Sequence, residues 1–138
     1  EGGVERTIPG SESSRSEWIG AVLDEAASHG HGDRWRLELR LALVEALANA
    51  VEHGHAGDES RSLSVAWRIR PEKAALRIAD GGSGFVPRID PESLASRPAG
   101  SPRGRGLEMI VGSVDEVTYN RDGNRLTLVK YPARPGEI

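Results

Sequence analysis

The spacing of apolar residues changes along this chain, and the order of the changes limits what it can fold into. Helical spacing of three or four residues predicts two consecutive helices, over residues 11–29 and 33–54. A short helix is predicted at 104–111. Alternation of apolar and polar residues predicts strands at 4–8, 63–69, 74–79, 114–120 and 126–131. This order predicts an α+β fold, a two-layer α/β sandwich with a mixed, mostly antiparallel sheet and its helices on one face.

Capping signals support the boundaries of the two long helices. Serine side chains from Ser11 onward are suited to cap the first helix, which we expect to end at His29. Asp33 is the expected N-cap of the second helix, and Gly54 follows its last turn. The second helix is unusually apolar, with periodic positions at Leu37, Leu41, Val44, Leu47, Ala48 and Val51.

The composition argues against several classes of function. The 138 residues suit one domain, which we expect to span 1–138. A net charge of -3 without blocks of like charge argues against direct nucleic-acid binding. The absence of cysteine excludes disulfides and thiolate sites and favours a cytoplasmic location. The longest apolar stretch, 41–51, is interrupted by Glu45 and Asn49, so no membrane span is expected.

Three polar residues, Glu45, Asn49 and Glu52, lie three or four positions apart in the apolar second helix and share a face. One interpretation is the solvated side of an amphipathic helix. Their neighbours, however, are alanines rather than charged residues, which leaves room for a ligand. A carboxylate and an amide one turn apart offer two oxygen ligands to a hydrated Mg²⁺, or one ligand and one base.

A first glycine cluster follows a predicted strand. Asp80 ends the strand, and Gly81, Gly82 and Gly84 come directly after it. An Asp-Gly turn is the simplest interpretation. Three glycines so close together also suit a backbone that approaches a ligand, and the carboxylate can accept a hydrogen bond from the exocyclic amine of a purine.

A second glycine cluster precedes the short helix. Gly104 and Gly106 place unpaired backbone N–H groups and the positive end of a helix at one point, which suits phosphate. Residues 81–103 between the clusters have no sustained periodicity and are predicted to form a long loop. The chain has no G-x-x-x-x-G-K-[ST] motif, so a P-loop is excluded.

Taken in order, these motifs resemble a known superfamily. Glu45-x-x-x-Asn49, Asp80-x-Gly82-x-Gly84 and Gly104-x-Gly106-Leu107 resemble the Bergerat-fold ATP-binding domains of gyrase and the sensor histidine kinases. The strings VEALANAVEHG, LRIADGGSGF and GRGLEMIVGSVDEVTY are most similar to the anti-sigma factor serine/threonine kinases. The resemblance spans nearly the whole chain and implies a single histidine-kinase-like ATPase domain with an ATP lid at about 85–103.

The resemblance implies a role for each matching residue. Asn49 would coordinate Mg²⁺ at the phosphates of ATP, Glu45 would be the general base toward a serine hydroxyl, and Asp80 would bind the adenine amine. Gly82 and Gly84 would give the adenine room. The triphosphate would be held through backbone amides of the second cluster, at Gly104, Arg105, Gly106 and Leu107.

The remaining features of the loop and the last hairpin leave alternatives. Arg103 and Arg105 would stabilise the transferring phosphoryl group, or they are exposed loop arginines. Many relatives carry Gly-Thr-Thr where this chain has Gly123, Asn124 and Arg125. This departure implies either a water in place of the threonine contact to the adenine site or weaker nucleotide binding.

As a whole, the resemblance implies an ATP- and Mg²⁺-dependent protein serine/threonine kinase. It would bind a sigma factor, phosphorylate a STAS-type anti-sigma-factor antagonist, and form a homodimer. Two alternatives are a nucleotide-dependent partner-switching module without catalysis and the ATPase module of a larger regulatory protein.

Overall fold

The computed structural model describes residues 3–54, 61–80, 110–120 and 125–133. The expected loop at 81–103, with its lid at 85–103, lies outside these residues. Both glycine clusters lie outside them as well, as does most of the helix expected at 104–111, of which 110–113 are described and helical.

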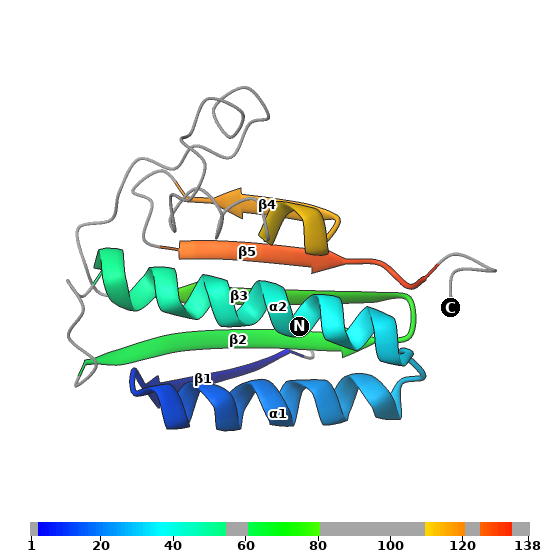
Figure 1. Cartoon of the computed structure of the whole chain (residues 1–138), viewed down its shortest axis with the longest axis horizontal. Coiled ribbons are helices and arrows are strands. Elements are labelled where there is room, and N and C mark those ends of the chain that lie inside the picture. Colours follow the sequence, from blue (N-terminus) through cyan, green and yellow to red (C-terminus); the bar gives the residue numbers. More distant parts are fainter. Residues whose placement is uncertain (1–2, 55–60, 81–109, 121–124, 134–138) are drawn as a thin grey trace.

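Five strands form one sheet in the order β1-β2-β3-β5-β4 (Figure 1). All four pairings are antiparallel, where the sequence pattern allowed a mixed sheet. β2 and β3 form a hairpin whose turn is Pro71 and Glu72, because antiparallel neighbours need only a short connection. β1 lies at an edge, as Pro9 indicated. The bounds are β1 Val4–Pro9, β2 Ser62–Arg70, β3 Lys73–Ala79, β4 Glu116–Tyr119 and β5 Arg125–Lys130.

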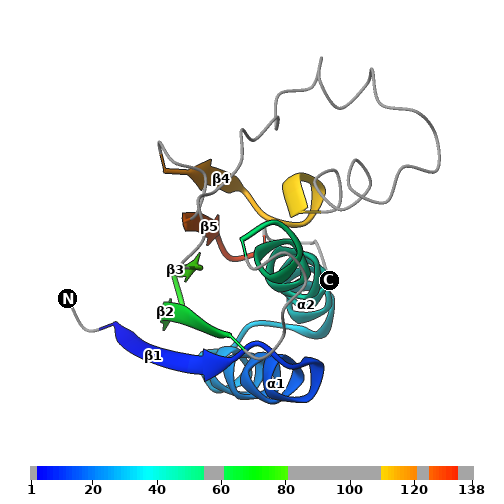
Figure 2. The same cartoon turned by 90° about the vertical axis from the view of Figure 1, so that its left-hand side faces the viewer.

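Two long helices, α1 (Glu12–Ser28) and α2 (Asp33–Asn49), cover one face of the sheet (Figure 2). Ser11 caps α1, as expected, by accepting a hydrogen bond from the backbone N–H of Ser14. The expected N-cap Asp33 is wrong, since Gly32 occupies that position without a side-chain hydrogen bond. The Asp33 carboxylate instead pairs with Arg36 at 2.6 Å, one turn further on. With both helices on one face of the sheet, the predicted two-layer α+β sandwich is confirmed.

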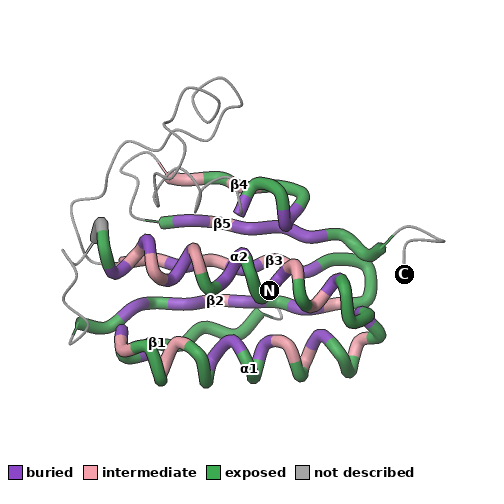
Figure 3. The backbone as a smooth tube through the Cα atoms, in the orientation of Figure 1, coloured by how far each residue is buried: buried purple, intermediate pink, exposed green. Residues whose placement is uncertain are grey.

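The core lies between the helices and the sheet (Figure 3), and in β2 and β3 every second residue is buried. In β2 the buried residues are Leu63, Val65, Trp67 and Ile69, and in β3 they are Ala74, Leu76 and Ile78. Trp67 meets Trp18 of α1 edge to face, with ring centroids 5.6 Å apart. The intervening strand residues face away from the helices.

The apolar residues of α2 divide between two faces. Leu39, Leu43 and Leu47 are fully buried against the sheet and α1, whereas three of the periodic positions read from the sequence are exposed: Leu37, Leu41 and Val44. Periodicity could not separate these faces because apolar residues surround most of the helix. No helix in the described ranges is long and apolar enough to cross a membrane.

Several helices and strands begin or end at the same end of the sandwich. α2, β3 and β4 end there, and β5 begins there, at the left of Figure 1. Ala79 pairs with Arg125 and Tyr119 pairs with Leu126, so the last residues of β3 and β4 lie level across β5. We call this end of the sandwich, with Asn49, Asp80 and Tyr119, the site edge.

Candidate functional site

A polar flank runs along α2 and consists of Glu38, Glu45 and Asn49. These residues are spaced by seven and four positions, so they lie on one side of the helix. Glu38 Oε1 accepts a hydrogen bond from Lys130 Nζ of β5 at 2.9 Å, which shows that this side of α2 faces β5. Glu45 and Asn49 therefore lie on the side of α2 that is turned toward β5, between the core and solvent.

Glu45 and Asn49 have no hydrogen-bond or ion-pair partner among the described residues. Asn49 is only 8% exposed, yet its amide makes no hydrogen bond with the described residues. Glu45 is partly buried and makes neither a hydrogen bond nor an ion pair with the same part of the chain. A side-chain amide offers one acceptor oxygen and two N–H donors, so Asn49 has capacity to bind something else.

The backbone changes at the same place. α2 ends at Asn49 and continues as a π-helical segment, η1 (Ala50–Gly54). Such wider turns occur often at functional sites because they re-aim side chains at the end of a regular helix. Asn49 is thus the last α-helical residue before a local change in backbone geometry.

Asp80 lies directly after β3, two positions beyond the buried Ile78, so the strand alternation directs it toward the helix layer. Tyr119 ends β4 and pairs with the buried Leu126, which places it on the same face. Burial, followed by the charge of Asp80, raises the pKa of Tyr119 to about 12. The two side chains are therefore close enough to interact electrostatically.

The donors at the site edge fit Mg²⁺ and a purine. Mg²⁺ is held in nucleotide sites by one or two protein oxygens and keeps several waters. The amide oxygen of Asn49 meets that requirement, with the Glu45 carboxylate one turn away. Asp80 supplies an acceptor for an exocyclic amine, and the neutral Tyr119 phenol borders it.

The remaining sequence candidates fall outside the described residues. These are Gly82, Gly84, Gly104, Arg105, Gly106 and Leu107. Of the predicted site, the structure brings Glu45, Asn49 and Asp80 to one end of the sandwich. Their roles remain predictions.

The opposite end of α2 has a second polar cluster, in which every group is paired. Lys130 is 7% exposed and donates from Nζ to Glu38 Oε1 and to the carbonyl of Ser113, at 2.9 and 2.7 Å. Trp35 Nε1 donates to the carbonyl of Tyr131 at 2.7 Å. His31 stacks on Trp35 with centroids 3.7 Å apart, and its Nε2 lies 2.9 Å from the carbonyl of Arg70.

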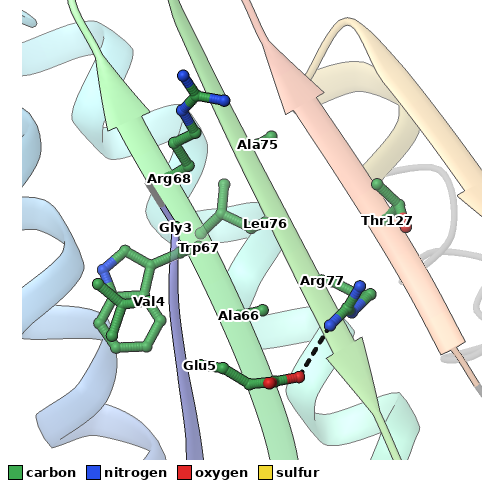
Figure 4. A pocket seen from close by; sticks show the side chains of 10 residues that line it. All are labelled: Gly3, Val4, Glu5, Ala66, Trp67, Arg68, Ala75, Leu76, Arg77 and Thr127. Carbon is green, nitrogen blue, oxygen red and sulfur yellow. Dashed lines mark hydrogen bonds and ion pairs between the residues drawn. The ribbon is translucent and has the colours of Figure 1, made fainter. Parts of the chain in front are cut away.

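Two hollows lie away from the site edge. One, of about 580 Å³, is lined by the paired cluster, including Trp35, Glu38 and Lys130. The other, of about 410 Å³, lies on the sheet face opposite the helices, where Arg77 and Glu5 form an ion pair at 3.0 Å (Figure 4). Neither includes Glu45, Asn49 or Asp80, so we assign the site from the chemistry of its side chains rather than from the size of a hollow.

Sequence reasoning missed Tyr119 as a neighbour of Asp80. The string VDEVTY shows only an alternating strand, and the two residues are 39 positions apart. Only the pairing of β3 and β4 with β5 brings them level. No local signal in the sequence could have indicated this contact.

Comparison with known proteins shows the family and the fold of the chain. A family model described as the histidine kinase-like ATPase domain matches residues 12–130. The serine-protein kinase RsbW of Listeria innocua is 27% identical over 101 residues, which cover 68% of this chain and 64% of that protein. The protein of the same name from Oceanobacillus iheyensis is 29% identical over 103 residues, or 70% of this chain and 65% of its own. The chain thus matches just under two thirds of the length of these curated relatives.

A solved structure shares the fold. The crystal structure of the RsbU and RsbW domains of Rv1364c from Mycobacterium tuberculosis superposes with a TM-score of 0.65 at 19% identity. The match covers 99% of this chain and 34% of that chain. At this identity the likeness shows the fold alone. Because the family model matches most of its length, the chain belongs to the histidine kinase-like ATPase domain family.

Proposed function

We propose that this protein is an ATP- and Mg²⁺-dependent protein serine/threonine kinase of the anti-sigma factor type. The observation that carries the proposal is the pair Glu45 and Asn49, which make no hydrogen bond or ion pair with the described residues and lie at the same end of the sandwich as Asp80. Similarity to proteins named serine-protein kinase RsbW supports the reaction class. The proposal treats residues 1–138 as a single domain with an ATP lid at about 85–103.

Nucleotide binding would use groups of different chemistry. Asp80 would accept a hydrogen bond from the adenine amine, with Gly82 and Gly84 leaving space for the ring. Backbone amides of Gly104, Arg105, Gly106 and Leu107 would bind the phosphates. Asn49 would hold Mg²⁺ through its amide oxygen, and the metal would neutralise charge on the phosphates.

Glu45 would carry the chemical step as the catalytic base. The substrate hydroxyl oxygen would form a bond to the γ-phosphorus while the bond from that phosphorus to the β,γ-bridging oxygen breaks. The hydroxyl proton would pass to the Glu45 carboxylate, and ADP would leave with the bridging oxygen. Glu45 is partly buried, and no cation in the described part of the chain pairs with it, which keeps its oxygens available for this proton.

The proposed partners are a sigma factor and a STAS-type anti-sigma-factor antagonist, with the antagonist as phosphate acceptor and the kinase acting as a homodimer. Because ATP and phosphorylation would change which partner is held, binding of one partner must alter affinity for the other by the same factor. The RsbW name of the relatives supports this assignment.

The direct test is transfer of labelled phosphate from ATP to the purified antagonist domain. Glu45→Ala should lower the rate by about 10²–10⁴-fold, since that is the usual contribution of a general base. The affinity for ATP should change little. Glu17→Ala, which removes an exposed carboxylate from α1, is the matched control and should transfer phosphate like the wild type. Equal rates for the wild type and Glu45→Ala would overturn the base assignment.

A second candidate is a nucleotide-dependent partner-switching module without catalysis, or the ATPase module of a larger regulatory protein. The specific observation in its favour is the structural match to a longer chain, of which only 34% is covered. In the same assay this candidate expects ATP binding and partner binding without phosphate transfer. Transfer by the wild type would exclude the module without catalysis as the sole function.

A further inference from the structure

An exposed apolar stripe runs along the solvent side of α2. It consists of Leu37, Leu41 and Val44, which are 55%, 39% and 44% exposed. Their spacing of four and three places them within about 60° of one another around the helix and spans about 10 Å along its axis. Single exposed leucines are ordinary, but a continuous stripe on a helix of a small domain marks a surface for a partner.

The stripe adjoins the proposed base. Leu41 lies one turn before Glu45, and Val44 precedes it directly, so the stripe borders the polar flank of α2. A protein whose hydroxyl comes within hydrogen-bond reach of Glu45 must cover the neighbouring surface of this helix. The stripe is the apolar surface that such a protein would meet there.

A cation lies on the opposite side of the stripe. Arg40 is exposed, three residues after Leu37 and four before Val44. It makes no ion pair or side-chain hydrogen bond with the described residues, whereas Arg34 and Arg36 of the same helix each pair with a carboxylate. A charge left unpaired beside an apolar surface favours a partner that brings a carboxylate.

From this arrangement we infer that Leu37, Leu41 and Val44 form the docking surface for the protein substrate that presents its hydroxyl to Glu45. The inference rests on the proposed kinase function and names the chemistry of its substrate. The substrate has an apolar patch about 10 Å long, an acidic side chain on the Arg40 side and a serine or threonine on the Glu45 side. Docking by this surface supplies the binding energy that holds the hydroxyl in position.

A second copy of the chain fits this surface less well. In a dimer formed through the stripe, α2 of each copy would cover the surface beside Glu45 of the other copy. That contact would exclude the substrate hydroxyl from the base. It would also bring two unpaired Arg40 side chains toward one interface, at an electrostatic cost.

The test is steady-state phosphate transfer to the antagonist domain that the wild-type protein phosphorylates. In Leu37→Gln/Leu41→Gln both leucines become polar residues of good helix propensity at exposed positions, so the fold should persist. We expect the KM for the antagonist to rise about tenfold or more, with kcat changed less than twofold. The Kd of MgATP should stay at the wild-type value. Arg40→Glu should raise the same KM, and the increase should shrink in high salt.

The matched control is Val4→Gln, which removes an exposed apolar residue of β1, and its KM should equal that of the wild type. An unchanged KM in both Leu37→Gln/Leu41→Gln and Arg40→Glu would overturn the docking surface while leaving the kinase intact. Conversion of a wild-type dimer to a monomer by the double variant, seen by light scattering, would overturn it in favour of a second copy. Absence of transfer by the wild type would overturn the proposed function itself.

Discussion

The two ends of α2 carry similar polar residues in opposite states. At its beginning, Lys130 and Glu38 share a hydrogen bond, and Trp35 donates to a backbone carbonyl. At its end, Glu45 and Asn49 have no hydrogen bond with the described residues. Hydrogen bonds between protein groups contribute to stability, whereas polar groups that make no such bond can serve a ligand. The contrast supports the proposal that one end of α2 stabilises the sandwich and the other end binds a ligand.

The largest expected effect comes from Asn49→Ala. Loss of the amide oxygen should weaken MgATP binding about 100-fold, which is about 2.7 kcal/mol. The free energy of unfolding should stay the same or rise slightly, because the amide makes no hydrogen bond within the described ranges and alanine is a better helix former. Isothermal titration with MgATP and urea unfolding measure the two quantities. If Asn49→Ala binds MgATP like the wild type but unfolds at lower urea concentration, the two ends of α2 do not differ in the way proposed.

The next effect is expected from Lys130→Met at the paired end. The substitution leaves Glu38 and the carbonyl of Ser113 without the ammonium, which should lower the free energy of unfolding by about 2 kcal/mol. MgATP affinity of the folded protein should change little. Thermal unfolding checks the loss, and the double variant Glu38→Gln/Lys130→Met should recover part of it. A free energy of unfolding for Lys130→Met equal to that of the wild type would show that the paired cluster does not stabilise the sandwich.

The smallest effect concerns the pH dependence of the site edge. Because the pKa of Tyr119 is raised to about 12, the unfolded chain loses this proton first, and stability falls as pH rises from 10 toward 12. Between pH 9 and pH 11 this effect should lower the free energy of unfolding by about 1 kcal/mol. Tyr119→Phe should remove this slope, measured by urea unfolding at both values.

Ultraviolet titration sharpens the same comparison. In a Tyr131→Phe background the remaining tyrosine should titrate well above 10, and Asp80→Asn should lower its pKa. An ordinary tyrosine titration that Asp80→Asn does not alter would separate Tyr119 from Asp80 and remove it from the site edge.

Much of the fold could be predicted because it depends on local patterns. Alternation in β2 and β3 indicated the hairpin, and the serines near Ser11 indicated the start of α1. The wrong N-cap at Asp33 has a local cause, since its carboxylate pairs with Arg36 instead of the backbone. The solvent side of α2 escaped prediction because leucine and valine occur on both of its faces.

The sequence by itself determined the order of elements, the α+β class and the presence of Glu45, Asn49 and Asp80 as candidate polar groups, because periodicity and motif spacing are properties of neighbouring residues. Tertiary structure alone decided which polar groups of the chain are paired. Lys130 meets Glu38 from 92 positions away, and Tyr119 lies level with Asp80 only through the register of β5. Whether a buried polar group is satisfied depends on contacts between distant segments, and these contacts form only when the helices pack on the sheet.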